Sequence, residues 1–561
     1  MATGIEAQLL DLVGIFIIAA AVGVFVAKVG RFPYTIALLL AGLAASVLGV
    51  HPGIPISHDL ILFVLLPPLL FEGAVNTELE RFRENLLPIL ALAGVGLVVS
   101  IAVLGYVGTT AFDFPLLVAL LFAAMILPTD PVSVLALFKE LGAPDRLSVL
   151  VEGESLINDG LGVVLFMTLL ELVQESQQTG FTASDLLTPG RLGSVALEIL
   201  VVSGGGLVVG LVAGYAVYRV MYNLDEHMTE TVLAIVLAYG SFLVAEHYLG
   251  VSGVIAVVVA GLFVGDRAAE NAMSPQTKIT VFNTLETGAF LANTFIFLMI
   301  GITTPIDVLV EHAALIALAI PLVLLARALA VYPICAALNR LVDRDIPFAY
   351  QHVLVWGGLH ASIPVALVLG LPAGTPYREE LRALVFGVAA FSLVVQGLTM
   401  GRVLDRLGVV TRTDAQRLYE LLTGRKRAVE DALDAAESLR RRGELPASVY
   451  RDFSDEYEAE EAALEDAIDE LLQTNPEIRR EQQLTGERRI LKQEKSAVMD
   501  VMREGIVSDD VGEQLLEEVN LKLNRVRDGE TTVGSDEEGF EEFWRERADD
   551  LGLDVPDRGE D

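Results

Sequence analysis

The sequence predicts an all-α membrane protein in which about 13 transmembrane helices, arranged as two six-helix inverted repeats, precede a soluble α-helical tail. Three observations support this fold class. Hydrophobic residues make up 53% of the 561 residues, and the mean hydropathy is +0.54. Apolar runs of about 17 to 25 residues, long enough to cross a bilayer as helices, recur up to residue 404. Beyond it, charged sequence with helical periodicity begins.

The apolar runs define the expected spans in chain order. They lie near residues 8–28, 34–50, 58–74, 86–112, 115–139, 147–174, 192–220, 230–248, 251–265, 280–302, 309–337, 348–372 and 379–401. Only the short stretch Tyr248, Leu249 and Gly250 lies at the junction of spans 8 and 9, so a merged helix there would shift the count by one. An odd count divides into six spans, one linker and six spans.

Loop charges predict the orientation, because Lys and Arg favour the cytoplasmic side of short loops. One set of alternate loops is rich in basic residues, namely Lys28, Arg31, Arg81, Arg83, Lys139, Arg146, Arg219, Arg267, Lys278, Arg340, Arg344, Arg402 and Arg406. The loops on the opposite side contain only three basic residues, Arg191, Arg378 and Arg382. We therefore expect a multi-pass protein of the cell membrane with its N-terminus outside and its C-terminal tail in the cytoplasm.

Composition also predicts the domain organisation. Residues 1–404 form the expected transmembrane domain, 405–530 a cytoplasmic helical regulatory tail, and 531–561 an acidic, disordered C-terminus. The net charge is −35, and about −20 of it falls in residues 411–561. Such acidity argues against nucleic-acid partners, which require basic patches. Scarce lysine and abundant carboxylate resemble the proteins of salt-loving archaea.

Two spans are predicted to be broken near the middle of the membrane. Span 5 contains Pro128 and Pro131 around Asp130, and span 12 runs from Gly357 and Gly358 to Pro364. Proline removes a backbone donor and interrupts a helix. Unwound backbone persists at membrane depth only where it lines a polar cavity or packs against protein. Because the two spans occupy equivalent places in the repeats, we expect them to cross at one site.

Span 6 carries a polar cluster in an otherwise apolar run. An acid at the bilayer centre costs roughly 3 kcal/mol, so Asp159 is a candidate functional residue. Residues four apart share a helix face, which places Ser155 beside Asp159 and Glu154 beside Asn158.

This cluster has the chemistry of a cation site. Carboxylate, hydroxyl and backbone carbonyl oxygens from Asp159, Ser155 and the Thr129 region suit a hard cation such as Na⁺. Na⁺ and H⁺ would compete for Asp159, because the carboxylate is neutral when it holds either one. An empty, charged carboxylate pays the penalty of crossing the membrane. The pattern therefore predicts cation/proton exchange without leak.

Three strings carry a family resemblance: LPTDPVSVLALFKELGAP, LVEGESLINDGLGVVLF and, upstream, LLPPLLFEGA. Over residues 8–405 the chain resembles the sodium/proton antiporter family in its electroneutral NhaP/NHE-like branch. The resemblance implies thirteen helices, a homodimer built from dimer and core subdomains, and an elevator-like motion of the core. An asparagine before the ion-binding aspartate implies one-for-one exchange.

The resemblance also assigns residue roles. It makes Asp159 the ion and proton carrier, and Asn158 the residue that holds the broken helices together. It pairs Glu154 with Arg327 of span 11, since a buried glutamate without a partner would be untenable. The residues expected close to Na⁺ are Asp159, Asp130, Thr129 and Ser155.

One position departs from the family pattern. Where relatives commonly read GGLRGA, this chain reads Gly357-Gly358-Leu359-His360-Ala361. An imidazole, which can titrate near neutrality, replaces a permanent charge. We hypothesise that His360 makes transport pH-sensitive; a structural histidine bonded to backbone is the open alternative.

Other functions remain open at this point. A potassium/proton antiporter would use the same mechanism, because sequence gives no ligand distances. A cation channel or sensor would need a pore lined by rings of carbonyls or charges, and no repeated filter sequence is present. We expect no enzymatic activity and no cofactor. The expected partners are monovalent cations, protons, membrane lipid and a second copy of the chain.

Overall fold

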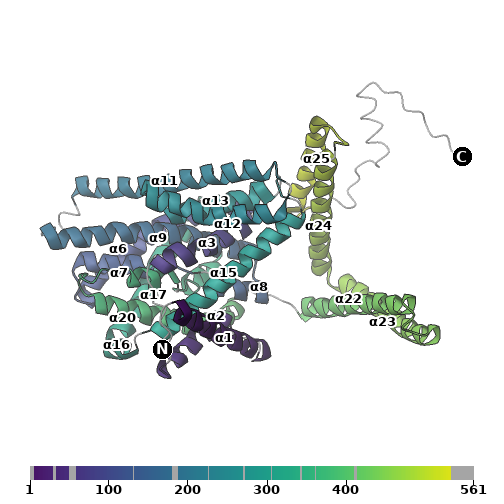
Figure 1. Ribbon diagram of the computed structural model, residues 1–561, viewed down its shortest axis with the longest axis horizontal. Coiled ribbons are helices and arrows are strands. Elements are labelled where there is room, and N and C mark those ends of the chain that lie inside the picture. Colours follow the sequence, from purple (N-terminus) through teal and green to yellow (C-terminus); the bar gives the residue numbers. More distant parts are fainter. Residues whose placement is uncertain are drawn as a thin grey trace. The chain divides into compact units, whose positions relative to one another are not determined.

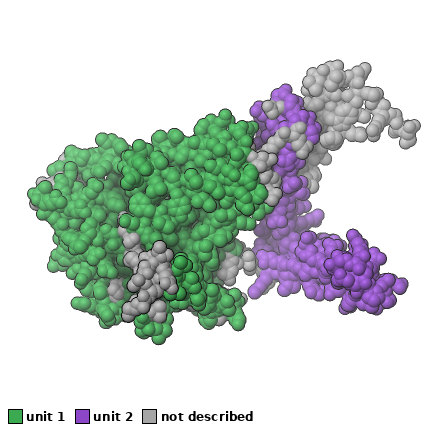
Figure 2. Space-filling view, in the orientation of Figure 1, with its two compact units in different colours: residues 1–411 green, residues 412–561 purple. Residues whose placement is uncertain are grey.

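The computed structural model describes residues 5–29, 33–49, 59–130, 132–179, 188–224, 226–269, 272–273, 275–304, 306–341, 344–360, 362–409, 414–503, 505–527 and 529–531. Within these ranges the regular secondary structure is helical, without strands (Figure 1). The chain divides into two compact units, residues 1–411 and 412–561 (Figure 2). The predicted all-α fold class is confirmed.

Each predicted span corresponds to one helix or to a run of consecutive helices, of which some segments are π-helical (η). In chain order these are α1 (Ile5–Val29), α2 (Tyr34–Val47), η1 (Leu60–Leu65), α3 (Leu66–Asn76), α5 (Leu86–Leu90), η2 (Ala91–Gly96), α6 (Leu97–Ala111), α7 (Leu116–Ile126), α8 (Val132–Leu141), α9 (Asp145–Thr179), α11 (Pro189–Met221), α12 (His227–Leu243), η3 (Val244–Leu249), α13 (Gly253–Phe263), η4 (Val264–Ala268), α15 (Pro275–Thr303), α17 (Ala313–Leu338), α18 (Phe348–Trp356), α19 (Ser362–Leu369), α20 (Arg378–Phe391), η5 (Ser392–Gln396) and α21 (Gly397–Arg406). Short helices α4 (Leu79–Glu84) and α16 (Ile306–Glu311) lie in connections.

Among the described residues, eight of these helical stretches are long and apolar enough to cross a membrane. Three further apolar stretches are shorter, namely Tyr34–Val47, Leu60–Asn76 and Leu116–Ile126. Spans 5 and 12 are each divided into two half-helices. The membrane character of the first unit is therefore established, whereas the count of thirteen spans stays a prediction.

Spans 8 and 9 are separate helices. Gly250, with φ 62°, adopts the left-handed conformation that commonly ends a helix. The side-chain oxygen of Ser252 then accepts a hydrogen bond from the backbone N–H of Ile255 and caps α13. The turn is tightened by Glu246, whose Oε2 accepts from Gly253 N at 2.9 Å. A chain reversal, not a continuous helix, connects the two spans.

Close helix packing in the first unit depends on small residues. A Cβ added to Gly42 would lie 2.2 Å from the carbonyl oxygen of Leu298, and one added to Gly301 would lie 2.3 Å from that of Leu39. Such close approach of two backbones is typical of helix pairs in membranes. The glycines thus let α2 and α15 touch along their backbones.

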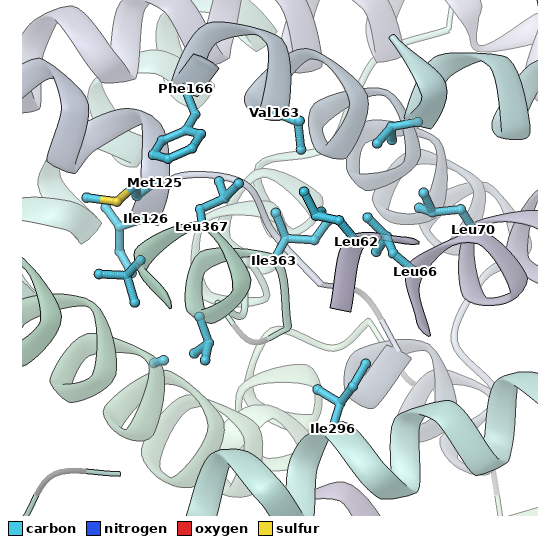
Figure 3. Packing of buried hydrophobic residues seen from close by; sticks show 14 of the residues in the cluster. Leu62, Leu66, Leu70, Met125, Ile126, Val163, Phe166, Ile296, Ile363 and Leu367 are labelled. Carbon is cyan, nitrogen blue, oxygen red and sulfur yellow. The ribbon is translucent and has the colours of Figure 1, made fainter. Parts of the chain in front are cut away.

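One large apolar cluster joins the two halves of the first unit. Around the broken helices it contains side chains from α7, α9 and α19, together with side chains from η1, α3 and α15. Figure 3 shows these residues converging, among them Met125, Ile126, Val163, Phe166, Ile363, Leu367, Leu62, Leu66, Leu70 and Ile296. Because protein interiors are close-packed, this shared core fixes the ends of the half-helices relative to α9.

The second unit consists of two helical hairpins. α22 (Asp414–Arg441) packs on α23 (Ala447–Thr474), with ion pairs Arg425–Glu460 at 2.6 Å and Lys426–Glu465 at 2.8 Å. α24 (Pro476–Arg503) packs on α25 (Asp509–Arg527) through Leu491, Val519 and Val526. Residues 532–561, almost the whole acidic C-terminus, lie outside the described residues. The domain boundaries at 404 and 530 stay predictions.

Candidate ion site at the crossing of two broken helices

The first break lies between the end of α7 at Ile126 and the start of α8 at Val132. Pro128, Thr129 and Asp130 lie in it, and all of them are buried. Pro131, the second proline assigned to this break, lies outside the described residues. Unwound backbone therefore occurs where the sequence predicted it, and it exposes the carbonyl groups of Pro128 and Thr129 to side chains from other helices.

The second break lies between the end of α18 at Trp356 and the start of α19 at Ser362. The sequence assigned Pro364 to this break; it lies in the first turn of α19, and its contribution to the break stays a prediction. There a missing N–H removes no intrahelical hydrogen bond. The break begins at Gly357 and Gly358, as predicted, and a Cβ on Gly358 would lie 2.4 Å from Nε of Arg327.

The two breaks cross and hydrogen-bond to each other. The backbone N–H of Asp130 donates to the carbonyl oxygen of Leu359 at 2.7 Å. Nδ1 of His360 donates to the carbonyl oxygen of Pro128 at 3.2 Å. The hydroxyl of Ser362, the first residue of α19, donates to Oδ2 of Asp130 at 3.2 Å. Backbone groups that the unwound segments would otherwise leave unpaired are thus satisfied across the crossing.

α9 brings its polar residues against this crossing. The hydroxyl of Ser155 donates to the carbonyl oxygen of Thr129 in the first break. One turn further on, Asp159 is 6% exposed, its Oδ1 has no hydrogen-bond partner, and its carboxylate interacts electrostatically with that of Asp130. A buried carboxylate oxygen without a donor is energetically costly. This oxygen is the atom at the crossing most in need of a proton or a cation.

Glu154 and Arg327 form the ion pair that the resemblance implied. Nη2 of Arg327 lies 3.0 Å from Oε1 of Glu154, and both side chains are buried. Nε of Arg327 also donates to the carbonyl oxygen of Leu354, in the last turn of α18, at 2.9 Å. One guanidinium therefore ties α9, α17 and the end of the broken span 12 together.

The predicted roles of Asn158 and His360 have unequal structural support. Asn158 is buried and its Oδ1 lacks a partner, so its bridging role stays a prediction. His360 is buried, and its ring Nδ1 donates to the backbone carbonyl of Pro128. The backbone N–H of His360 donates to Ser392 Oγ at 2.8 Å. These contacts match the structural alternative for His360, and its pH-sensing role stays a hypothesis.

The oxygen set suits an alkali cation. Within the described ranges, no group of three or more His, Cys, Asp or Glu is arranged to hold a metal ion. The crossing instead combines carboxylates with a hydroxyl and a backbone carbonyl. Hard monovalent and divalent cations prefer such oxygens, whereas transition metals prefer nitrogen and sulfur.

Sequence reasoning missed Ser392 and Gln396 on η5. Ser392 contacts the backbone of His360, and Nε2 of Gln396 donates to the carbonyl oxygen of Trp356 at 2.7 Å. Both residues lie inside the apolar run of span 13, where averaging over a window hides single polar residues. A glutamine in the middle of a span is the signal that could have identified this contact.

Comparison with known proteins agrees with this architecture. Residues 15–406 match the family described as sodium/hydrogen exchanger, transmembrane. The Na(+)/H(+) antiporter NhaG of Bacillus atrophaeus is 36% identical over 518 residues, which cover 89% of this chain and 94% of that protein. The Na(+)/H(+) antiporter ApNhaP of Aphanothece halophytica is 36% identical over 403 residues, covering 72% and 75%.

The fold also resembles a solved structure, that of the sodium proton antiporter MjNhaP1 from Methanocaldococcus jannaschii at pH 8. The TM-score is 0.58 at 19% identity, over 71% of this chain and 99% of that chain. This likeness supports the fold, and the sequence matches carry the assignment. The chain belongs to the sodium/hydrogen exchanger family.

Proposed function

We propose that this protein exchanges Na⁺ for H⁺ across the cell membrane, one for one and electroneutrally, by alternating access, with both ions competing for Asp159. The observation that carries the proposal is the unpartnered, buried Oδ1 of Asp159 beside the crossing of the two broken helices. The relatives named above as Na(+)/H(+) antiporters agree with it.

Competition at one carboxylate accounts for coupling. Asp159 with a proton and Asp159 with Na⁺ both contribute zero net charge, so either loaded form can change its access. The empty form carries an uncompensated negative charge, which is costly in a low-dielectric interior. The site therefore reorients only when loaded, and net movement of one ion requires movement of the other in the opposite direction.

Neighbouring groups complete the cation's ligand shell. The Ser155 hydroxyl uses its proton on the Thr129 carbonyl, which leaves its own lone pairs for Na⁺. The Thr129 carbonyl oxygen has a second lone pair. Asp130 adds negative charge beside Asp159. Oδ2 of Asp130 accepts a hydrogen bond from Ser362 at the N-terminus of α19, where a negative charge is favourable.

The remaining parts of the proposal concern the whole assembly. The protein works as a homodimer in which a core subdomain carries Asp159 past a dimer subdomain. Its N-terminus lies outside, and the helical tail in the cytoplasm regulates transport. The Glu154–Arg327 pair is neutral as a unit and holds the broken span 12 against α9. Asn158 stabilises the same crossing.

The test is cation-driven pH change in proteoliposomes that contain a lumenal dye. Na⁺, Li⁺ and K⁺ are added separately, with the membrane potential clamped or free. Wild type should move protons on addition of Na⁺, independently of potential, and Asp159→Asn should not. The matched control is Asp113→Asn, which alters an exposed acid in the loop before α7 at φ 57°, a conformation that asparagine tolerates.

Each outcome has a defined meaning. Activity with K⁺ in place of Na⁺ would make the protein a potassium/proton antiporter with the same mechanism. Proton movement that follows the membrane potential would contradict electroneutral exchange and favour a channel. Activity that survives Asp159→Asn would remove this carboxylate as the carrier.

A further inference from the structure

The last span presents two polar side chains to the second break. Its middle segment, η5, is π-helical over Ser392–Gln396. Such segments change the direction in which the following residues face and occur often at functional sites. Ser392 and Gln396 are only 0% and 1% exposed, although they lie in an apolar run. Buried polar residues of this kind in a span require a specific partner.

Both residues bind backbone that the break releases from its helix. Trp356 is the last residue of α18, so its carbonyl oxygen has no intrahelical donor, and it accepts from Nε2 of Gln396 at 2.7 Å. The Ser392 hydroxyl accepts from His360 N at 2.8 Å and donates to His360 O at 3.2 Å. The second break is therefore held by hydrogen bonds both from η5 and from the first break.

The same arrangement occurs in the first half with one chemical difference. There α9 places Ser155 and Asp159, four residues apart, against the first break, and the Ser155 hydroxyl binds the carbonyl of Thr129. In the second half Ser392 and Gln396 are also four apart on the span that follows the broken one. In both halves the serine hydroxyl donates to a carbonyl oxygen of the break. Four residues later, the second half has the hydrogen-bonded amide of Gln396, whereas the first half has the Asp159 carboxylate with an unpartnered Oδ1.

We propose that Ser392 and Gln396 are positioning residues for ion binding, the uncharged counterpart of Ser155 and Asp159 in the second repeat. The amide N–H of Gln396 donates to a break carbonyl and permanently fills the role that a proton or a cation fills on Asp159. This leaves the crossing with one carrier carboxylate. The inference rests on the proposed exchange function and names residues that support the same site.

A continuous chain of contacts connects these residues to the carrier. Ser392 and Gln396 fix the segment from Trp356 to His360, whose Leu359 carbonyl accepts from Asp130 N. The same segment leads into Ser362, whose hydroxyl holds Oδ2 of Asp130. If η5 loses its hydrogen bonds to the second break, the Asp130 carboxylate should shift relative to Asp159. The affinity for Na⁺ should then fall while the fold, which depends on a large apolar core, persists.

The experiment compares variants of the full chain in proteoliposomes. Ser392→Ala removes both hydrogen bonds to His360, and Gln396→Met removes the one to Trp356. The KM for Na⁺ should therefore rise about tenfold in each variant, or about 1.4 kcal/mol. Ser392→Thr keeps the hydroxyl and should restore the wild-type KM. The matched control is Gln351→Met, because Gln351 is also buried and its Nε2 donates to a carbonyl, that of Ile346 at 2.9 Å, near the other end of α18. Its KM should stay at the wild-type value.

A second variant gives a readout that loss of packing would not produce. In Gln396→Glu the protonated acid can still donate to the Trp356 carbonyl, whereas the ionised form places two acceptors against each other. Exchange by this variant should resemble wild type at low pH and decline as the pH rises, beyond any decline in Gln396→Met. His360 and Arg327 are present in both variants, so their contributions cancel in this comparison.

The outcomes separate the inference from the proposed function. Wild type without Na⁺/H⁺ exchange would contradict the function itself. With wild type active, an unchanged KM in folded Ser392→Ala and Gln396→Met would overturn the inference. An equal rise in Gln351→Met would also overturn it, because the effect would then be general. If Gln396→Met does not fold, the pH profile of Gln396→Glu is compared with that of wild type. A wild-type profile contradicts the inference, and a decline at alkaline pH beyond that of wild type supports it.

Discussion

Replacing Arg327 by methionine should destabilise the first unit more than any other single loss of charge at the crossing. The substitution keeps most of the side-chain length but removes every donor. Glu154 would keep its carboxylate in a buried place without the guanidinium that now lies 3.0 Å away. The Leu354 carbonyl at the end of α18 would lose its donor at 2.9 Å as well.

The magnitude follows from these two losses. Leaving one partner of a buried ion pair uncompensated costs about 3–5 kcal/mol. An unsatisfied buried carbonyl adds about 1–3 kcal/mol, and part of this cost is recovered if the helix end relaxes. We therefore expect Arg327→Met to reduce the free energy of unfolding by about 4 kcal/mol or more. Glu154→Gln should cost less, because Arg327 keeps its bond to Leu354.

A double-mutant cycle separates the ion pair from the carbonyl contact. Unfolding would be followed in mixed detergent micelles for wild type, Arg327→Met, Glu154→Gln and the double variant. Since the double variant has no uncompensated charge, it should be more stable than the sum of the single losses by about 1–3 kcal/mol. Additive losses, or an Arg327→Met cost below about 1 kcal/mol, would refute the view that this pair secures the crossing.

Two further predictions concern close contacts. Gly358→Ala places a Cβ 2.4 Å from Nε of Arg327, so the guanidinium must move off Leu354, and we expect a loss of about 1–3 kcal/mol in the same unfolding assay; wild-type stability would contradict the stated contact. In the tail, hydrogen bonds from Arg425 lower the pKa of Glu460 below its ordinary value of 4.5. The stabilising contribution of these bonds is therefore present above pH 4.5 and is lost as the pH falls through the lowered pKa. Acid should then increase hydrogen exchange in α22 and α23 more in wild type than in Arg425→Met. Equal acid responses in the two proteins would contradict this prediction.

The sequence predicted those parts of the fold that depend on local pattern. Apolar runs located the spans, because hydrophobic length alone selects a bilayer-crossing helix. The first break was predicted through Pro128, since proline removes a backbone donor wherever it occurs. The acid cluster of span 6 was predicted because an ionisable group within the hydrocarbon core is costly and therefore indicates a functional site.

The parts that sequence reasoning missed depend on contacts between distant segments. The glycines at the start of the second break were named from the sequence, but the room that Gly358 makes there for Arg327 from α17 was not. Whether a glycine ends a helix depends on what packs against it, and one sequence does not reveal that neighbour. Gln396 was a visible signal within span 13, but its partner, the Trp356 carbonyl, lies in a distant segment that the local pattern does not identify.

The charges at the crossing explain why exchange at this site should not depend on membrane potential. Glu154 is compensated by Arg327, and Gln396 contributes no charge. Oδ2 of Asp130 accepts a hydrogen bond from Ser362 at a helix N-terminus, where a negative charge is favourable. In the proposed cycle, Asp159 is the acid at the crossing whose charge alternates between empty and loaded. Because H⁺ and Na⁺ carry the same charge, both loaded forms have the same net charge when they reorient, and a membrane potential acts equally on the outward and the return step. A second free carboxylate at the place of Gln396 would remove this equality, since the two ions could then load in different numbers.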